Sequence, residues 1–266
     1  MNPKELYAAG KLDDAIQAAL SAVKANPGDK NMRFFLAELL CFGGDWERAD
    51  RQLDSVVQQT TDANLLALLF RQLIRAEVIR DQVFAEGRAP ELVVALPRDA
   101  ELQLELCAAL RLNHSTDVPQ LVSTAEEARA VVSGECNGQA FSGIRDLDDR
   151  IAGVLEVLTA NGKYFWVPWV SVKTLEFEPP QRPMDLLWRK ASIDVEGGPE
   201  GEVYVPTRYP GPQSAGWDEQ LRLGRSTAWQ GDEQSAMSGL GLRMLLVGEE
   251  ALSIMELKNV SLVQAE

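Results

Sequence analysis

The residues best suited to chemistry in this chain of 266 residues are carboxylates near its middle. Asp146, Asp148 and Asp149 stand close together, and Glu156 follows. Two carboxylates can divide into a general acid and a general base when their surroundings differ, as they do in glycosidases. A small hydrolase acting through Asp146, Asp148 and Glu156 is therefore one alternative. The other interpretation is that these aspartates hold turns or touch a partner, since turn aspartates bond to their own backbone.

Other reactive residues are scarce. His114 is the only histidine, and Cys41, Cys107 and Cys136 are widely spaced, with no CxxC pair. One histidine and scattered thiols cannot build the usual zinc site or a disulfide framework. No phosphate-binding loop, dinucleotide fingerprint or Gly-x-Ser-x-Gly elbow is present. The sequence therefore predicts a protein that is not an enzyme and that holds no cofactor or metal.

The charge balance is strongly acidic, with a formal net charge of −14. Such a chain lacks the basic stripe that neutralises phosphates, so nucleic acid and anionic membranes are disfavoured partners. A cationic partner would be attracted by the same field. No apolar run approaches the ~20 residues that cross a bilayer, and the first residues lack a signal peptide's apolar core. We expect a soluble, cytoplasmic protein.

The elements that carry these residues follow two different periods. Residues 1–136 show helical spacing, and residues 10–15 align with residues 44–49 at an offset of 34. That offset is typical of tetratricopeptide repeats, in which a glycine lies in the turn and a small alanine lets paired helices approach. Residues 137–266 instead alternate with period two, and Asn161-Gly162 is a strong hairpin signal.

We therefore predict an α+β protein of two domains. The first, residues 1–136, is a tetratricopeptide-like α-superhelix, and the second, residues 137–266, is a small β barrel for which an SH3-like barrel is one candidate. Helical repeats stack into concave surfaces that bind other proteins. A repeat domain whose concave face is filled by its own β domain would be a purely structural scaffold, which is a further alternative.

Several co-linear segments resemble the ImpE family, also called TagJ or SciE-like, across nearly the whole chain. These segments are RQLIRAE at 71–77, RDLDDR at 145–150, GKYFWVP at 162–168, DLLWR at 185–189, LGRSTAW at 223–229 and GLGLR at 239–243. The resemblance implies a non-enzymatic, cytoplasmic accessory or adaptor protein of type VI secretion. It also implies binding to the N-terminal helix of the small contractile-sheath subunit and a functional link to the sheath-disassembly ATPase.

Helix recognition needs an apolar groove with anchors at helical spacing. We predict that Phe34, Phe35 and Leu39 line such a groove, with Glu38, Arg71 and Arg75 as polar guides. Asp146 and Asp148 are second candidates from the β domain. The acidic balance of the chain favours a basic amphipathic helix as the ligand.

Overall fold

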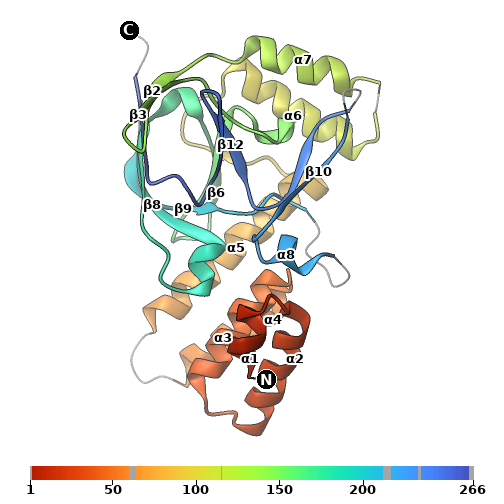
Figure 1. The fold of residues 1–266 in the computed structure, drawn as a ribbon, viewed down its shortest axis with the longest axis vertical. Coiled ribbons are helices and arrows are strands. Elements are labelled where there is room, and N and C mark those ends of the chain that lie inside the picture. Colours follow the sequence, from red (N-terminus) through yellow and green to blue (C-terminus); the bar gives the residue numbers. More distant parts are fainter. Residues whose placement is uncertain (1, 60–63, 115, 212–216, 233–234, 264–266) are drawn as a thin grey trace.

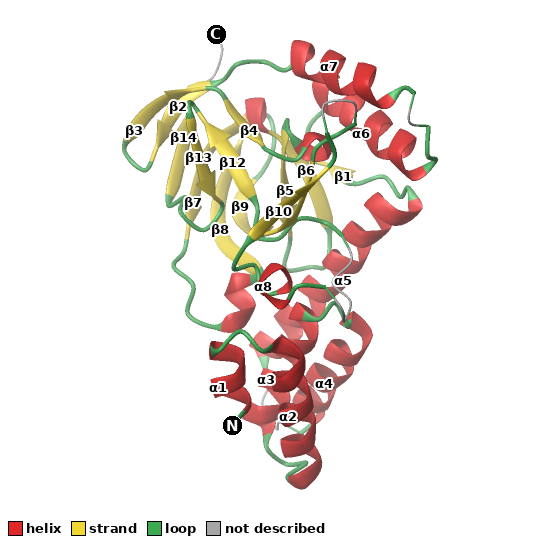
Figure 2. Cartoon of the chain, turned by 45° about the vertical axis from the view of Figure 1, so that its right-hand side comes forward, coloured by secondary structure: helices red, strands yellow, loops and turns green. Residues whose placement is uncertain are grey.

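The computed structural model describes residues 2–59, 64–114, 116–211, 217–232 and 235–263. Helices fill the first half of the described chain and strands fill most of the second half (Figures 1 and 2). The helices are α1 Pro3–Ala8, α2 Leu12–Ala25, α3 Lys30–Phe42, α4 Trp46–Gln58, α5 Leu65–Glu86, α6 Arg98–Arg111 and α7 Val118–Ala128, with a short α8 at Glu219–Arg222. The predicted α+β class and the helical first region are confirmed.

Helices α1 to α4 form two stacked antiparallel pairs at the lower end of the molecule (Figure 1). Gly10 turns the chain between α1 and α2, and Gly44 turns it between α3 and α4. Both glycines have left-handed backbone angles, φ +78° and φ +71°, which a residue with a Cβ rarely adopts. The offset of 34 in the sequence therefore marks the same turn in two successive helix pairs.

Helix α5 runs between the helix pairs and the strand-rich region (Figure 1). The Asn64 side chain caps its first turn by accepting a hydrogen bond from the Ala67 amide, and Gly87 ends it in the left-handed conformation. Helix α5 packs against α4 of the helical region and against β5 and β6 of the large sheet, which makes it the element that joins the two regions.

The strands form three open sheets. The strands are β1 Glu91–Leu92, β2 Ser133–Cys136, β3 Gln139–Ser142, β4 Ile144–Asp146, β5 Val154–Leu158, β6 Tyr164–Pro168, β7 Val172–Phe177, β8 Trp188–Val195, β9 Glu200–Pro206, β10 Thr227–Gln230, β11 Ser238–Gly241, β12 Met244–Val247, β13 Glu250–Ser253 and β14 Asn259–Leu262. The large sheet has the order β1-β6-β5-β9-β8-β7-β14-β2-β3, and smaller sheets pair β10 with β11 and order β13-β12-β4. The described strands therefore do not close into the predicted barrel, because β1 and β3 remain the two edges of the large sheet.

The hairpin predicted at Asn161-Gly162 joins β5 to β6, with Val154 opposite Pro168 and Leu158 opposite Tyr164. Every residue of β5 is buried. Since side chains alternate along a strand, Val154, Glu156 and Leu158 share one face, and Leu155 and Val157 share the other. The first face packs in the core that contains α5, and the second packs in a separate core with β12. Glu156 is thereby directed toward the helical region.

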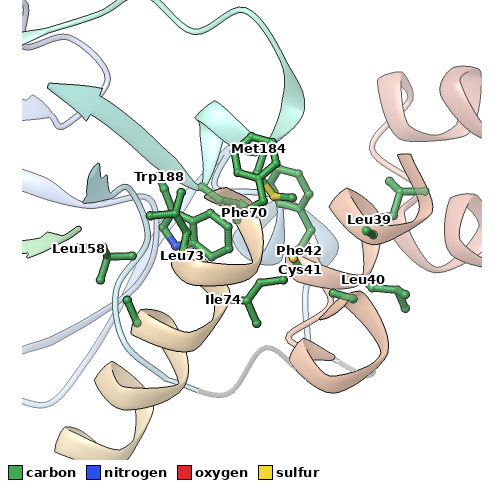
Figure 3. Packing of buried hydrophobic residues seen from close by; sticks show 14 of the residues in the cluster. Leu39, Leu40, Cys41, Phe42, Phe70, Leu73, Ile74, Leu158, Met184 and Trp188 are labelled. Carbon is green, nitrogen blue, oxygen red and sulfur yellow. The ribbon is translucent and has the colours of Figure 1, made fainter. Parts of the chain in front are cut away.

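One hydrophobic core spans the helical and strand-rich regions. Phe42 of α3 and Phe70 and Leu73 of α5 are buried together with Met184 and Trp188 from the second half (Figure 3). Helix α7 ends at Ala128 and β2 begins at Ser133, while the domain boundary between residues 136 and 137 stays a prediction. Within the described residues, no helix is long and apolar enough to cross a membrane.

Candidate functional site

The junction between α5 and the large sheet is a buried charge network centred on Arg80, whose side chain is 2% exposed. Its guanidinium donates hydrogen bonds to both carboxylate oxygens of Glu156, at 2.7 and 2.8 Å, and to Glu77 at 2.8 Å. It also donates to the main-chain oxygen of Arg208 at 2.9 Å. One arginine on α5 therefore holds a carboxylate of β5 and the backbone beyond β9.

Glu156 has further partners on the sheet side. Arg243 lies 3.2 Å from Glu156 and pairs with Asp146 at 2.7 Å. The Tyr164 hydroxyl donates to Glu156 and accepts a hydrogen bond from the Trp166 indole. Although burial opposes the charged form, Arg80 and Arg243 lower the pKa of Glu156 to about 2. Glu156 is thus the negatively charged partner of both arginines at the centre of this network.

The three carboxylates of the hydrolase alternative are all fully buried, at 0% exposure. Asp146 pairs with Arg243, Asp148 pairs with Arg150, and Glu156 pairs with Arg80. Asp148 also accepts a hydrogen bond from the Gly239 amide at 2.9 Å. Their oxygens are used by internal partners and have no contact with solvent, so the acid and base proposed for a hydrolase are ion-pair residues of the fold.

The helical region offers a different kind of site, a concave pocket of about 510 Å³. Its walls come from the chain at α1, α3, α4, the start of α5, and the 3-10 helix η3 (Pro183–Leu186) that precedes β8. The lining residues are Lys4, Tyr7, Lys30, Asn31, Phe34, Phe35, Glu38, Val56, Asn64, Leu66, Arg182 and Pro183. We call this the concave pocket.

Phe34 is a half-buried aromatic residue of the concave pocket. Its ring lies 5.6 Å from the ring of Phe70, and the guanidinium of Arg182 lies 5.6 Å from its centroid. Glu38 is 5% exposed and accepts a hydrogen bond from the Met184 amide at 3.4 Å. Burial raises the pKa of Glu38 to about 7, against the opposing effect of Arg182. The pocket therefore combines an apolar floor with a few polar groups, as ligand sites usually do.

The predicted groove residues separate into three groups. Phe34, Phe35 and Glu38 line the concave pocket, although Phe35 is only 6% exposed. The prediction for Leu39 is corrected, because Leu39 is 0% exposed and lies beside Leu40 in the core (Figure 3). Asp146 and Asp148 are corrected for the same reason, since their fully buried carboxylates cannot reach a partner at the surface.

The two predicted arginine guides lie away from the concave pocket. Arg71 pairs with Asp50 at 2.7 Å and with Asp54, both on α4, so it braces α4 against α5. Arg75 is exposed and lines a larger cavity of about 1320 Å³ between α4, α5 and the strand-rich region. Trp46 lines the same cavity and donates its indole hydrogen to Asp81 at 2.7 Å. The sequence therefore brought together residues that the fold divides between two sites.

Nine lining residues of the concave pocket were not predicted, namely Lys4, Tyr7, Lys30, Asn31, Val56, Asn64, Leu66, Arg182 and Pro183. Lys4 and Tyr7 could have been found, because the first helix of a repeat lies beside the first helix of the next. Arg182 and Pro183 come from the strand-rich region, and nothing in their local sequence places them against α3. Among the described residues, no group of three or more His, Cys, Asp or Glu side chains could hold a metal ion.

Comparisons with known proteins agree with this architecture. The profile of the family described as ImpE protein matches residues 138–261, and a tetratricopeptide repeat profile matches residues 6–70. The type VI secretion system accessory component TagJ of Pseudomonas aeruginosa is 34% identical over 232 residues, which cover 86% of this chain and 81% of that protein. A crystal structure of a Vibrio parahaemolyticus protein has a TM-score of 0.90 at 30% identity and covers 99% of this chain and 98% of its own.

Proposed function

Since this chain belongs to the ImpE/TagJ family of type VI secretion accessory proteins, we propose that it is a non-enzymatic adaptor. Its ligand is the N-terminal helix of the small contractile-sheath subunit, and its task is to influence how the sheath is handled or disassembled. It acts in the cytoplasm alongside the sheath-disassembly ATPase. Neither nucleic acid nor a membrane takes part.

The observation that supports this proposal most is the open concave pocket around Phe34. Helix recognition by a groove uses apolar anchors on one side of the bound helix and a few polar contacts beside them. The pocket offers Phe34, Leu66 and Tyr7 as apolar walls, none of which is fully buried. Tetratricopeptide-like repeats typically present such surfaces to other proteins.

The scaffold alternative has one observation in its favour. The strand-rich region fills part of the concave face, because Met184 of η3 is fully buried against the helical core. The remaining 510 Å³ nevertheless stays open beside η3. In a purely structural scaffold we would expect the whole concave face to be filled. The part that stays open therefore favours an adaptor that binds a partner.

The buried ion pairs of the strand-rich region support the proposal that the protein is not an enzyme. The carboxylates nominated as acid and base are buried and paired with Arg80, Arg150 and Arg243. A general base must come within hydrogen-bond reach of a substrate proton, which side chains at 0% exposure do not.

Isothermal titration with the N-terminal segment of the small sheath subunit from the same secretion cluster tests the proposal. A segment of about 20 residues is long enough to form a helix in the pocket. We expect saturable one-to-one binding, and Phe34→Ala should weaken it by about 2 kcal/mol, since truncating a buried anchor has effects of that size. No binding by the wild-type protein at high micromolar peptide would contradict the proposed partner.

A further inference from the structure

The rim of the concave pocket is cationic, although the protein as a whole is acidic. Lys4 stands on α1, Lys30 is the first residue of α3, and Arg182 directly precedes η3. All three are exposed. Within the described part of the chain, none of their charged side-chain nitrogens lies within 4.0 Å of a carboxylate oxygen. The main-chain amide of Arg182 donates to Asp185 at 3.0 Å, and its guanidinium lies over the Phe34 ring.

Arginines on the neighbouring helices α4 and α5 behave differently. Arg48 pairs with Asp45 at 3.0 Å, and Arg71 pairs with Asp50 at 2.7 Å. Arg51 likewise pairs with Glu47. The acidic residues of α4 and its cap are thus paired within the helical region, whereas no ion pair among the described residues includes Lys4, Lys30 or Arg182.

Two helix N-termini lie beside the pocket, and the one that begins α5 adds to this positive field. Lys30 and Asn31 belong to the first turn of α3, and Asn64 and Leu66 belong to the start of α5. All four residues line the pocket. Unpaired amides in the first turn of a helix carry about half a positive charge, which favours a nearby anion. At α3 the carboxylate of the cap residue Asp29 already offsets this partial charge. At α5 the cap is the neutral Asn64 side chain, so the partial charge there acts in the same direction as the three cationic side chains.

Glu38 is the one carboxylate among the lining residues given above. Burial raises its pKa to about 7, so at neutral pH it carries only part of a negative charge. It therefore does not cancel the three exposed cations.

We propose that the occupant of the concave pocket is a partner helix that places an acidic side chain between apolar anchors, so that its carboxylate meets Lys30 and Arg182. This inference rests on the proposed function and names the charge class of the partner segment at that site. It reverses the basic helix expected from the net charge of the chain. Local complementarity selects the partner because charges in contact outweigh a diffuse field screened within about 8 Å.

Salt dependence cannot identify the charge of the partner, because salt weakens the attraction of either sign at contact. A pair of synthetic helical peptides of about 15 residues gives a direct test. Both carry the same leucines at helical spacing, and their remaining charged positions are all glutamate in one peptide and all lysine in the other. Fluorescence anisotropy at a single ionic strength measures the affinity of each for the full chain.

We expect the glutamate peptide to bind at least about tenfold more tightly than the lysine peptide. The variant Lys30→Gln with Arg182→Gln should abolish that preference. The control variant Lys11→Gln with Lys24→Gln makes the same change of charge at exposed positions of α2 and its cap, and should retain it. Circular dichroism of each variant establishes that the fold is kept.

Equal affinities, a preference for the lysine peptide, no saturable binding of the glutamate peptide, or a preference that survives Lys30→Gln with Arg182→Gln would each overturn the inference. Failure of the proposed function has a different signature. In that case the glutamate peptide binds the pocket, while the N-terminal segment of the sheath subunit does not.

Discussion

The junction and the concave pocket are built from the same kinds of side chain and use them in opposite ways. At the junction, Arg80 and Arg243 are at most 2% exposed and each contacts carboxylates. Around the concave pocket, Lys30 and Arg182 are exposed and no carboxylate of the described residues pairs with them. The comparison teaches that burial and pairing separate charges that hold the fold from charges that are available to a partner.

Energetics differ accordingly. Moving a guanidinium and a carboxylate out of water has a cost of several kcal/mol per ion, which the pair recovers only with good geometry and additional hydrogen bonds. At the junction, Arg80 donates two hydrogen bonds to the Glu156 carboxylate, and the Tyr164 hydroxyl donates a further one. These hydrogen bonds offset the cost of burying the two charges. The cations of the pocket are exposed and form no ion pair among the described residues, so we expect them to contribute little to folding.

The largest effect is expected from Arg80→Met. This change leaves Glu77 and Glu156 buried without their shared cation, which should reduce the free energy of unfolding by about 3–5 kcal/mol. Urea denaturation measures the loss. Arg98→Met, at a side chain 58% exposed, is the control and should leave the midpoint unchanged. A loss below about 1 kcal/mol for Arg80→Met would show that the junction does not hold the two regions together.

Adjacent phenylalanines sharpen the comparison. Phe35 is 6% exposed in the core, so Phe35→Ala should reduce the free energy of unfolding by about 3–5 kcal/mol. Phe34 is half-buried at the pocket, so Phe34→Ala should have a smaller effect on unfolding and should weaken partner binding by about 2 kcal/mol. Paired denaturation and titration measure both quantities. Equal effects of the two substitutions on both quantities would remove the distinction.

Glu38→Gln tests the buried carboxylate of Glu38 through the pH dependence of stability. The pKa of Glu38 is about 7 in the folded protein and 4.5 as a free group. Between these values the folded protein binds more protons than the unfolded chain, so its stability falls as the pH rises from 4.5 to 7. Relative to wild type, Glu38→Gln should therefore gain stability on the order of 1 kcal/mol at about pH 8 and much less at about pH 4.

Arg182 and Lys4 oppose this shift of the Glu38 pKa, while Asp185 adds to it. The exposed Glu135→Gln in β2 is the matched control, and its effect should be equal at both pH values. A stability difference between Glu38→Gln and wild type that does not change with pH would contradict the raised pKa.

The smallest effect is expected from Arg71→Gln. Its pairs with Asp50 and Asp54 lie at the surface between α4 and α5, where such pairs contribute about 0–1 kcal/mol. Partner affinity should not change, because Arg71 does not line the concave pocket. If Arg71→Gln lowers the affinity for the partner segment in titration, Arg71 takes part in partner recognition and this prediction is wrong.

Features set by neighbouring residues could be predicted from the sequence. The repeat could be predicted because its two turns both need a left-handed residue, and glycine stands at each, Gly10 and Gly44. The hairpin could be predicted because its turn has a left-handed residue at Gly162, φ +82°, which glycine favours. The face of α3 could not be predicted. Phe34 to Phe42 is apolar on nearly all sides, so helical period does not distinguish Leu39 in the core from Phe34 at the pocket.

Features that depend on residues far apart in the sequence could not be predicted from the sequence. Asp146 is buried because Arg243, 97 positions away, pairs with it, and Glu156 because of Arg80, 76 positions away. Arg182 reaches the pocket only because the core places η3 against α3. Sequence reasoning therefore named Phe34, Phe35 and Glu38 from the helical wall of the pocket and none of the residues that folding brings from the strand-rich region.

Hydrogen exchange with and without the N-terminal segment of the small sheath subunit tests the central claim most directly. If the concave pocket is the recognition surface, bound peptide should slow exchange in the first half of α3, at the start of α5 and around η3. Exchange in the junction strands β5 and β6 should not change. Protection confined to the cavity between α4 and α5 around Trp46, with residues 30–38 unchanged, would contradict the claim.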